Sequence, residues 1–291
     1  MYQYYIYGLG IHTEIKLYNL EEQEVPQDVL VHYGTVSEDI AEYTKKGLAS
    51  TMSPRRVWFR NDIGHFVISG GTDILVQPLG SADENDLASF ILGWCIAFLF
   101  QQRGYSAIHS SAIEIKEQAV LVAGFSGAGK STIALSLIDA GYRYLADDIA
   151  MVNPKGDLML QPAFPQQKVC RNIAEKMGTD ELLYINEKKD KFAYYNTKDF
   201  CDVPRRLTTM FMLNKYDGDK VLVEEVTGVE KLNSILLNLF LLDAYKAMDF
   251  TLEEKARCLE LAGKITIYRI SRPVGKDTVQ EIRDTIIQLV Q

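Results

Sequence analysis

The chain has 291 residues, of which 47% are hydrophobic and 24% are charged, a balance typical of an ordered globular protein rather than a disordered chain. Its formal net charge of −8 argues against a protein that binds duplex nucleic acid, because such proteins neutralise phosphates with a clustered basic surface. The four cysteines are scattered without a CxxC pair, which indicates neither a zinc site nor a disulfide framework.

The first 80 residues contain short β-rich runs separated by Gly, Pro, Asp and Asn, and they predict a small mainly-β domain. The predicted strands are 4–9, 14–18, 29–33, 56–60, 64–68 and 72–77. The apolar run from Ala88 to Phe100 has 13 residues, whereas a membrane-spanning helix needs about 20. Since the first residues also lack the features of a secretory signal, we expect a buried linking helix in a cytoplasmic protein with no membrane segment.

From residue 104 the pattern changes to that of an α/β domain. Predicted strands at 107–115 and 119–123 lead into a glycine-rich loop, a helix at 131–140 and a strand at 144–146, the order typical of a phosphate-loop core. Further on, short strands alternate with helices predicted at 229–247, 251–263 and 276–290. We therefore expect a mainly-β domain with its linking helix at 1–103 and a nucleotide-binding domain at 104–291.

The segment Gly124-Phe125-Ser126-Gly127-Ala128-Gly129-Lys130-Ser131 has the spacing of a Walker A phosphate loop. Its glycines allow positive φ and a close backbone approach, so that amide N–H groups at a helix N-terminus can surround phosphate oxygens. The Lys130 ammonium can reach the β- and γ-phosphates, and the Ser131 hydroxyl can bind Mg²⁺. The predicted nucleotide-binding residues are Gly124, Ser126, Gly127, Ala128, Gly129, Lys130, Ser131 and Thr132.

Two adjacent carboxylates, Asp147 and Asp148, follow the next predicted strand. One of them can hold Mg²⁺ while the other accepts a proton from an attacking hydroxyl, although an ordinary acidic turn has the same sequence. His109 lies in the strand that enters the core, where a solitary histidine among apolar neighbours is more often a structural residue than a catalytic one.

Several basic residues of the second domain are weaker candidates for contacts with the transferring phosphate or with the acceptor. They are Lys168, Arg171, Lys191, Arg205, Arg206 and Arg269. Each is more often a solvated surface charge. Lys191 and Arg205 are the first two to consider, because each lies near a predicted strand.

Three segments in this order, 109–112 (His-Ser-Ser-Ala), 122–132 around the phosphate loop and 141–148 ending in the aspartate pair, resemble the catalytic domain of the HPr kinase/phosphorylase group. That resemblance implies a fold shared with phosphoenolpyruvate carboxykinases and transfer of phosphate from ATP to a serine hydroxyl. It implies that Lys130 and Ser131 contact nucleotide and Mg²⁺, Asp147 is the general base, Asp148 faces the metal, and His109 belongs to the same site. Relatives often assemble through this domain, so the resemblance is compatible with a homo-oligomer, although the sequence does not indicate the oligomeric state.

A looser resemblance concerns the segments 66–69, 82–84 and 103–105, which are similar to HPr-kinase-like proteins of peptide-modification clusters, including lasso-peptide tailoring kinases. Those proteins phosphorylate a serine of a precursor peptide. The Arg-Gly-rich segment that follows the aspartate pair in HPr-directed enzymes is not found in this chain, which favours an acceptor other than HPr.

The sequence therefore predicts an ATP- and Mg²⁺-dependent kinase that phosphorylates a hydroxyl, most simply a serine, of a peptide or protein. Two alternatives remain open at this stage. One is a kinase for a small metabolite such as a free amino acid, or a carboxykinase-like phosphotransferase. The other is a regulator that binds ATP without transferring its phosphate, although binding alone would not require a base such as Asp147.

Overall fold

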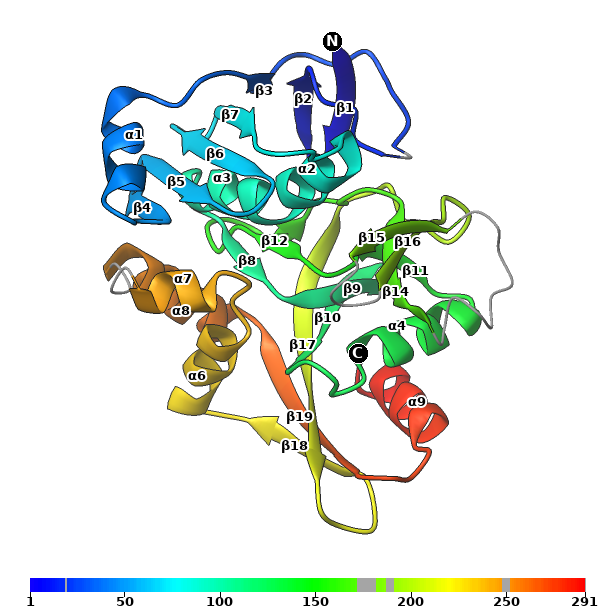
Figure 1. The fold of residues 1–291 in the computed structure, drawn as a ribbon. Helices are drawn as coiled ribbons and strands as arrows, with labels where there is room; N and C mark the ends of the chain where they lie inside the picture. Colours follow the sequence, from blue (N-terminus) through cyan, green and yellow to red (C-terminus); the bar gives the residue numbers. More distant parts are fainter. Residues whose placement is uncertain (19, 172–181, 187–190, 248–251, 291) are drawn as a thin grey trace. The chain divides into compact units, whose positions relative to one another are not determined.

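The computed structural model describes residues 1–18, 20–171, 182–186, 191–247 and 252–290 (Figure 1). The chain divides into two compact units, Met1–Tyr105 and Ser106–Gln291. The first unit is rich in β-strands and the second mixes strands with helices, which agrees with the predicted α/β class. Among the described residues, no helix combines the length and the apolar character needed to cross a membrane.

The first unit is built on a seven-stranded sheet with the order β1-β2-β3-β7-β6-β5-β4. Its strands are β1 (Tyr2–Ile6), β2 (Leu9–Thr13), β3 (Val29–Tyr33), β4 (Ser50–Ser53), β5 (Arg56–Arg60), β6 (Gly64–Ser69) and β7 (Asp73–Pro78). The pairs β2–β3 and β3–β7 are parallel and the other pairs are antiparallel. Aromatic and β-branched side chains dominate these strands, and such residues favour a pleated surface that is partly buried.

Two predicted strands of this unit were wrong. The run 4–9 is a hairpin rather than a strand, because Tyr7 and Gly8 have φ values of 52° and 78° and form the two-residue turn between β1 and β2. The run 14–18 leaves the sheet after β2. There the Thr13 hydroxyl accepts a hydrogen bond from the Ile15 N–H at 3.0 Å, and this local contact takes the place of strand pairing.

The helices of the first unit are α1 (Glu38–Lys45), α2 (Glu84–Phe90), the π-helical turn η1 (Ile91–Cys95) and α3 (Ile96–Gln102). The predicted linking helix lies within the run from α2 to α3, which begins at a capping box between Asp83 and Asp86. Helix α1 was not predicted. Its Ile40 packs in a small core with Trp58 and Val67, so tertiary contacts stabilise a helix of only eight residues.

The second unit is built on a sheet with the order β11-β9-β10-β17-β19-β18, to which β13 adds beside β17. Its strands are β9 (Ser110–Ile115), β10 (Gln118–Gly124), β11 (Arg143–Ala146), β13 (Met159–Leu160), β17 (Arg205–Tyr216), β18 (Leu222–Val226) and β19 (Thr266–Pro273). Strands β10, β17 and β19 are parallel neighbours. Two smaller sheets, β8–β12 and β14–β16–β15, are formed by β8 (Ser106–Ile108), β12 (Ala150–Val152), β14 (Gln166–Cys170), β15 (Leu183–Asn186) and β16 (Lys191–Tyr195).

The helices of the second unit are α4 (Lys130–Asp139), α6 (Val229–Leu237), α7 (Leu242–Ala247), α8 (Leu252–Lys264) and α9 (Val279–Leu289). Helices α4 and α9 cover one face of the sheet, and their buried residues share a core with β9, β10, β17 and β19 (Figure 1). Helices α6 and α8 pack together on the other side of the sheet (Figure 1). The helix predicted at 229–247 is divided in two, because Phe240 donates its N–H to Ala107 O at 2.8 Å.

Candidate active site

The phosphate-loop sequence connects the end of β10 to the start of α4, at the edge of the sheet where the parallel strands β10, β17 and β19 end. Helix α4 begins at Lys130, directly after Gly129, whose φ is 113°. A helix start of this kind presents unpaired N–H groups and the positive end of the helix dipole. The loop therefore has the backbone arrangement that binds phosphate oxygens.

Gly124, the first glycine of the loop, must be a glycine. Its φ is 137°, and a Cβ added there would lie 2.4 Å from Leu213 O of the neighbouring strand β17. Its N–H donates to the side-chain oxygen of Asn238, at the end of α6, at 2.9 Å. The carbonyl oxygen of Asn238 in turn accepts from the His109 N–H at 2.7 Å. One buried asparagine thus connects the start of the loop with His109.

Cationic side chains from three elements gather around this loop. The Lys130 ammonium donates to Gly124 O at 2.7 Å. From the end of β19, the Arg272 Nε donates to Ala128 O at 2.8 Å. The Lys215 ammonium, from β17, lies near Gly127 of the loop, since a Cβ added at this glycine would be 3.7 Å from it. These charges lower the free energy of an anion bound at the loop.

Asp147 follows β11 and is half-buried, and each of its carboxylate oxygens accepts one hydrogen bond. The Ser111 hydroxyl donates to Oδ1 and the Lys168 backbone N–H donates to Oδ2, both at 2.7 Å. Burial raises the pKa of Asp147 above its ordinary value, and the two hydrogen bonds oppose that rise. Each carboxylate oxygen has two lone pairs, so the group can accept a further hydrogen bond in its fixed orientation.

Asp148 has a φ of 72°, a left-handed conformation uncommon for a residue with a side chain and frequent at functional sites. Its Oδ2 accepts from the Lys168 ammonium at 2.8 Å. Its backbone carbonyl lies 2.9 Å from His109 Nδ1, and since a carbonyl only accepts, Nδ1 carries the proton. His109 itself lies in the break between β8 and β9, with its ring 5.9 Å from that of Phe240.

These groups surround one cavity of about 280 Å³. It is lined by His109, Ser110, Ser111, Ser126, Gly127, Gly129, Lys130, Ser131, Thr132, Asp147, Asp148, Lys168 and Arg272. The lining contains three cationic side chains and two carboxylates, so its charge balance is positive, which suits an anionic ligand. The volume is near the lower end for ligand pockets, about 300–1,000 Å³, and suits the phosphate chain of a nucleotide.

The donor groups of this cavity also fit Mg²⁺. Within the described ranges, no three His, Cys, Asp or Glu side chains cluster into an all-protein metal site. Mg²⁺ in phosphoryl-transfer sites is commonly held by one or two protein oxygen ligands together with the phosphates of the substrate. Asp148 and Ser131 supply such hard oxygen donors at the cavity that the phosphate loop borders.

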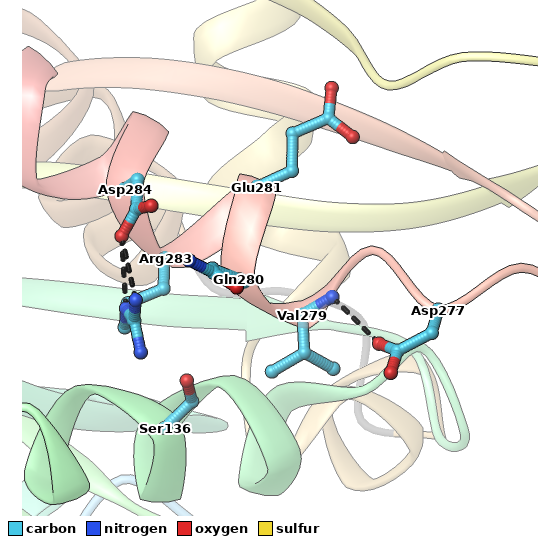
Figure 2. A pocket seen from close by; sticks show the side chains of 7 residues that line it. All are labelled: Ser136, Asp277, Val279, Gln280, Glu281, Arg283 and Asp284. Carbon is cyan, nitrogen blue, oxygen red and sulfur yellow. Dashed lines mark hydrogen bonds and ion pairs between the residues drawn. The ribbon is translucent and has the colours of Figure 1, made fainter.

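A second, larger cavity of about 640 Å³ lies between α4 and the N-terminal part of α9. Figure 2 shows Ser136 of α4 across from the side chains of Val279 and Arg283. The Arg283 guanidinium is paired with Asp284 at 3.0 Å, and the remaining charges of the lining, Asp277 and Glu281, are negative. This lining disfavours a nucleotide phosphate, and it contains none of the predicted site residues.

Of the predicted site residues, His109, Ser126, Gly127, Gly129, Lys130, Ser131, Thr132, Asp147 and Asp148 line the smaller cavity. Gly124 and Ala128 belong to the same loop. Arg205 does not line the cavity; its Nε contacts Glu114 Oε1 at 2.5 Å. Lys191 begins β16, and its side chain lies outside the described part of the chain.

The sequence reasoning missed Arg272, Lys215 and Asn238, and it placed Lys168 only among the weaker candidates. Arg272 and Lys215 could have been found from one signal, a basic residue near the end of each predicted strand that runs parallel to β10. The ends of parallel strands meet at one edge of the sheet, where α/β proteins bind ligands. No comparable signal marks Asn238, because only the packing of α6 brings it to the loop.

Comparisons of sequence and structure with known proteins find similarity to HPr kinases. Residues 102–174 match the family model described as the HPr Serine kinase C-terminal domain. An HPr kinase/phosphorylase of Streptococcus thermophilus is 31% identical over 118 residues, which covers 36% of this chain and 38% of that protein. One of Prosthecochloris aestuarii is 39% identical over 56 residues, covering 19% and 16%.

Among solved structures, the Hpr(Ser) kinase/phosphatase from Coxiella burnetii aligns with a TM-score of 0.32 and 13% identity, over 63% of this chain and 93% of that one. In both sequence relatives the match spans less than two fifths of the relative's length. The matched residues include the phosphate loop, the aspartate pair and Lys168. Over this region, the chain is therefore similar to the HPr Serine kinase C-terminal domain.

Proposed function

We propose that this chain is an ATP- and Mg²⁺-dependent kinase that phosphorylates a serine hydroxyl of a peptide or protein. The observation that supports this most directly is the position of Asp147. A half-buried carboxylate held by two hydrogen bonds lines the same cavity as Lys130 and the phosphate loop. Phosphoryl transfer needs this combination of a positioned proton acceptor and fixed positive charge.

In the proposed reaction, the acceptor hydroxyl gives its proton to Asp147 as its oxygen forms a bond to the γ-phosphorus of ATP. The bond between the γ-phosphorus and the β–γ bridging oxygen breaks, and ADP leaves with the electron pair. Lys130 and the amides of the loop stabilise the charge on the phosphate oxygens. Ser131 and Asp148 would hold Mg²⁺, which when bound neutralises the β- and γ-phosphates.

The acceptor is proposed to be a peptide of a natural-product pathway or a protein such as HPr, which the names of the sequence relatives mention. A direct comparison separates the two. The chain is incubated with labelled ATP in three parallel reactions. One contains HPr, one a library of serine-containing peptides, and one a pool of free amino acids. Label on a peptide supports the first acceptor and label on HPr supports the second, whereas a labelled amino acid favours a small-metabolite kinase.

The variant Asp147→Asn tests the proton-accepting role. It keeps the shape of the side chain but removes its basicity, so transfer should fall by about 10²–10⁴-fold while ATP affinity changes little. Asp139→Asn, at the exposed end of α4, is the matched control. Full transfer by Asp147→Asn, with intact ATP binding, would exclude Asp147 as the base.

A further inference from the structure

Lys168 contacts both members of the aspartate pair through different groups. Its backbone N–H donates to Asp147 Oδ2 at 2.7 Å, and its ammonium donates to Asp148 Oδ2 at 2.8 Å. The ion pair is largely shielded, with 18% of the Lys168 side chain and 15% of the Asp148 side chain exposed. Shielding from solvent makes such a pair stronger than a typical surface salt bridge.

The Lys168 ammonium occupies the side of Asp148 to which a cation would bind. A carboxylate oxygen that ligates Mg²⁺ cannot keep an ammonium at hydrogen-bond distance without strong repulsion between the two cations. The other carboxylate oxygen, Asp148 Oδ1, lies 3.4 Å from His109 Nδ1. Metal binding at Asp148 Oδ2 therefore requires the ammonium to move.

The cavity offers the ammonium a second anionic partner once nucleotide is bound. Lys168 lines it together with Lys130 and Ser131 of the phosphate loop. A lysine side chain is a mobile point charge on a flexible stem, so it can change partners while its backbone stays in place. Here the backbone N–H of Lys168 can keep its hydrogen bond to Asp147 throughout.

We propose that Lys168 exchanges partners in the catalytic cycle: its ammonium neutralises Asp148 before nucleotide binds, and moves to the γ-phosphoryl group when Asp148 takes Mg²⁺. This inference rests on the proposed kinase function. No covalent bond changes in the exchange, and the ammonium keeps its proton. The exchange prevents two adjacent bare carboxylates from facing an incoming triphosphate, and it delivers positive charge to the group that is transferred.

The variant Lys168→Met tests the exchange, because it removes the ammonium but keeps the backbone N–H on Asp147. Binding of Mn²⁺, as a spectroscopic probe for Mg²⁺, is measured by electron paramagnetic resonance with ADP present. Without the competing ammonium, Lys168→Met should bind Mn²⁺ about tenfold tighter than the wild type. With a non-hydrolysable ATP analogue this advantage should shrink, since the γ-phosphate takes the ammonium in the wild type.

Phosphoryl transfer is the second measurement, and Lys168→Met should slow it by about 10²–10³-fold, as expected for the loss of a charge that acts on the transition state. Lys264→Met is the matched control, because Lys264 also pairs with a carboxylate, Glu260 at 2.7 Å, but does not line the cavity. Circular dichroism is used to check that each variant is folded.

Equal or weaker Mn²⁺ binding by folded Lys168→Met with ADP would overturn the exchange, and so would unchanged phosphoryl transfer. The Mn²⁺ comparison needs no acceptor. If the wild type phosphorylates no acceptor at all, the proposed kinase function fails, while the Mn²⁺ comparison still decides whether Lys168 competes with the metal for Asp148.

Discussion

Replacing Arg205 with methionine tests whether this residue contacts substrate or stabilises the fold. In the structure its Nε donates to Glu114 Oε1 at 2.5 Å, and Arg143 Nε donates to Glu114 Oε2 at 2.9 Å. Only 10% of the Glu114 side chain is exposed. Two arginines on β11 and β17 therefore compensate one buried charge on β9, and we expect Arg205→Met to affect stability rather than catalysis.

The magnitude follows from what the substitution leaves behind. Arg205→Met removes one charge-assisted hydrogen bond, for which about 1.5–3 kcal/mol is typical, while Arg143 keeps Glu114 partly compensated. A loss near 2 kcal/mol corresponds to a fall in Tm of about 4–8 °C for a unit of this size. Leaving the carboxylate without either arginine would cost more, about 3–5 kcal/mol.

The pH dependence gives an independent check. Burial raises the pKa of Glu114, but the hydrogen bonds from Arg205 and Arg143 outweigh it and leave the pKa below the ordinary value of 4.5. A carboxyl group with a lowered pKa stabilises the fold above its ordinary pKa, and this contribution is lost as the pH falls through the folded-state pKa. The difference in stability between wild type and Arg205→Met should therefore be full at pH 7 and shrink below pH 4.5.

The assay is a double-mutant cycle of Arg205→Met and Glu114→Gln, followed by thermal and urea unfolding. The coupling free energy between the two residues should account for most of the effect of Arg205→Met. Phosphoryl transfer below the unfolding temperature should keep its KM for the acceptor. An unchanged Tm together with a raised KM would refute this reasoning and restore Arg205 as a substrate contact.

Two further substitutions examine the start of the phosphate loop. Gly124→Ala should abolish nucleotide binding, measured by titration with ATP, because the new Cβ would meet Leu213 O at 2.4 Å. Gly141→Ala is the control, since Gly141 also has positive φ but has open space around it. This control variant should lose only about 1–2 kcal/mol of folding stability and keep ATP binding. Asn238→Ala should leave the Gly124 N–H unpaired, lower stability by about 1–3 kcal/mol and weaken ATP binding. The exposed Asn233→Ala on the same helix is its control, and equal ATP affinity in both variants would contradict the role given to Asn238.

The strongest signals in the sequence were local. Gly124, Gly129 and Lys130 specify a turn, a helix start and an ammonium within seven residues, so short-range backbone geometry suffices to predict the loop. The predicted helix directly after it agrees with α4, and the strand before the aspartate pair agrees with β11. Short β-rich runs bounded by turn residues also identified most strands of both sheets.

Errors arose where distant contacts override local preference. The helix predicted at 229–247 ends early, because the chain at Leu239 and Phe240 pairs with β8 instead of continuing the helix. Helix α1 is stabilised because Ile40 packs against Trp58 and Val67. This contact could not be predicted from the eight residues of the helix alone.

The phosphate loop and the aspartate pair could be predicted from the sequence alone, because each is formed by residues adjacent in the chain. The cations that lie near them could be identified only from the three-dimensional fold. Lys168 and Arg272 line the same cavity as the loop, whereas Arg205, equally basic and also on a strand, is paired with Glu114. Strand register and strand order set these distances, and both depend on contacts across the whole sheet rather than on neighbouring residues.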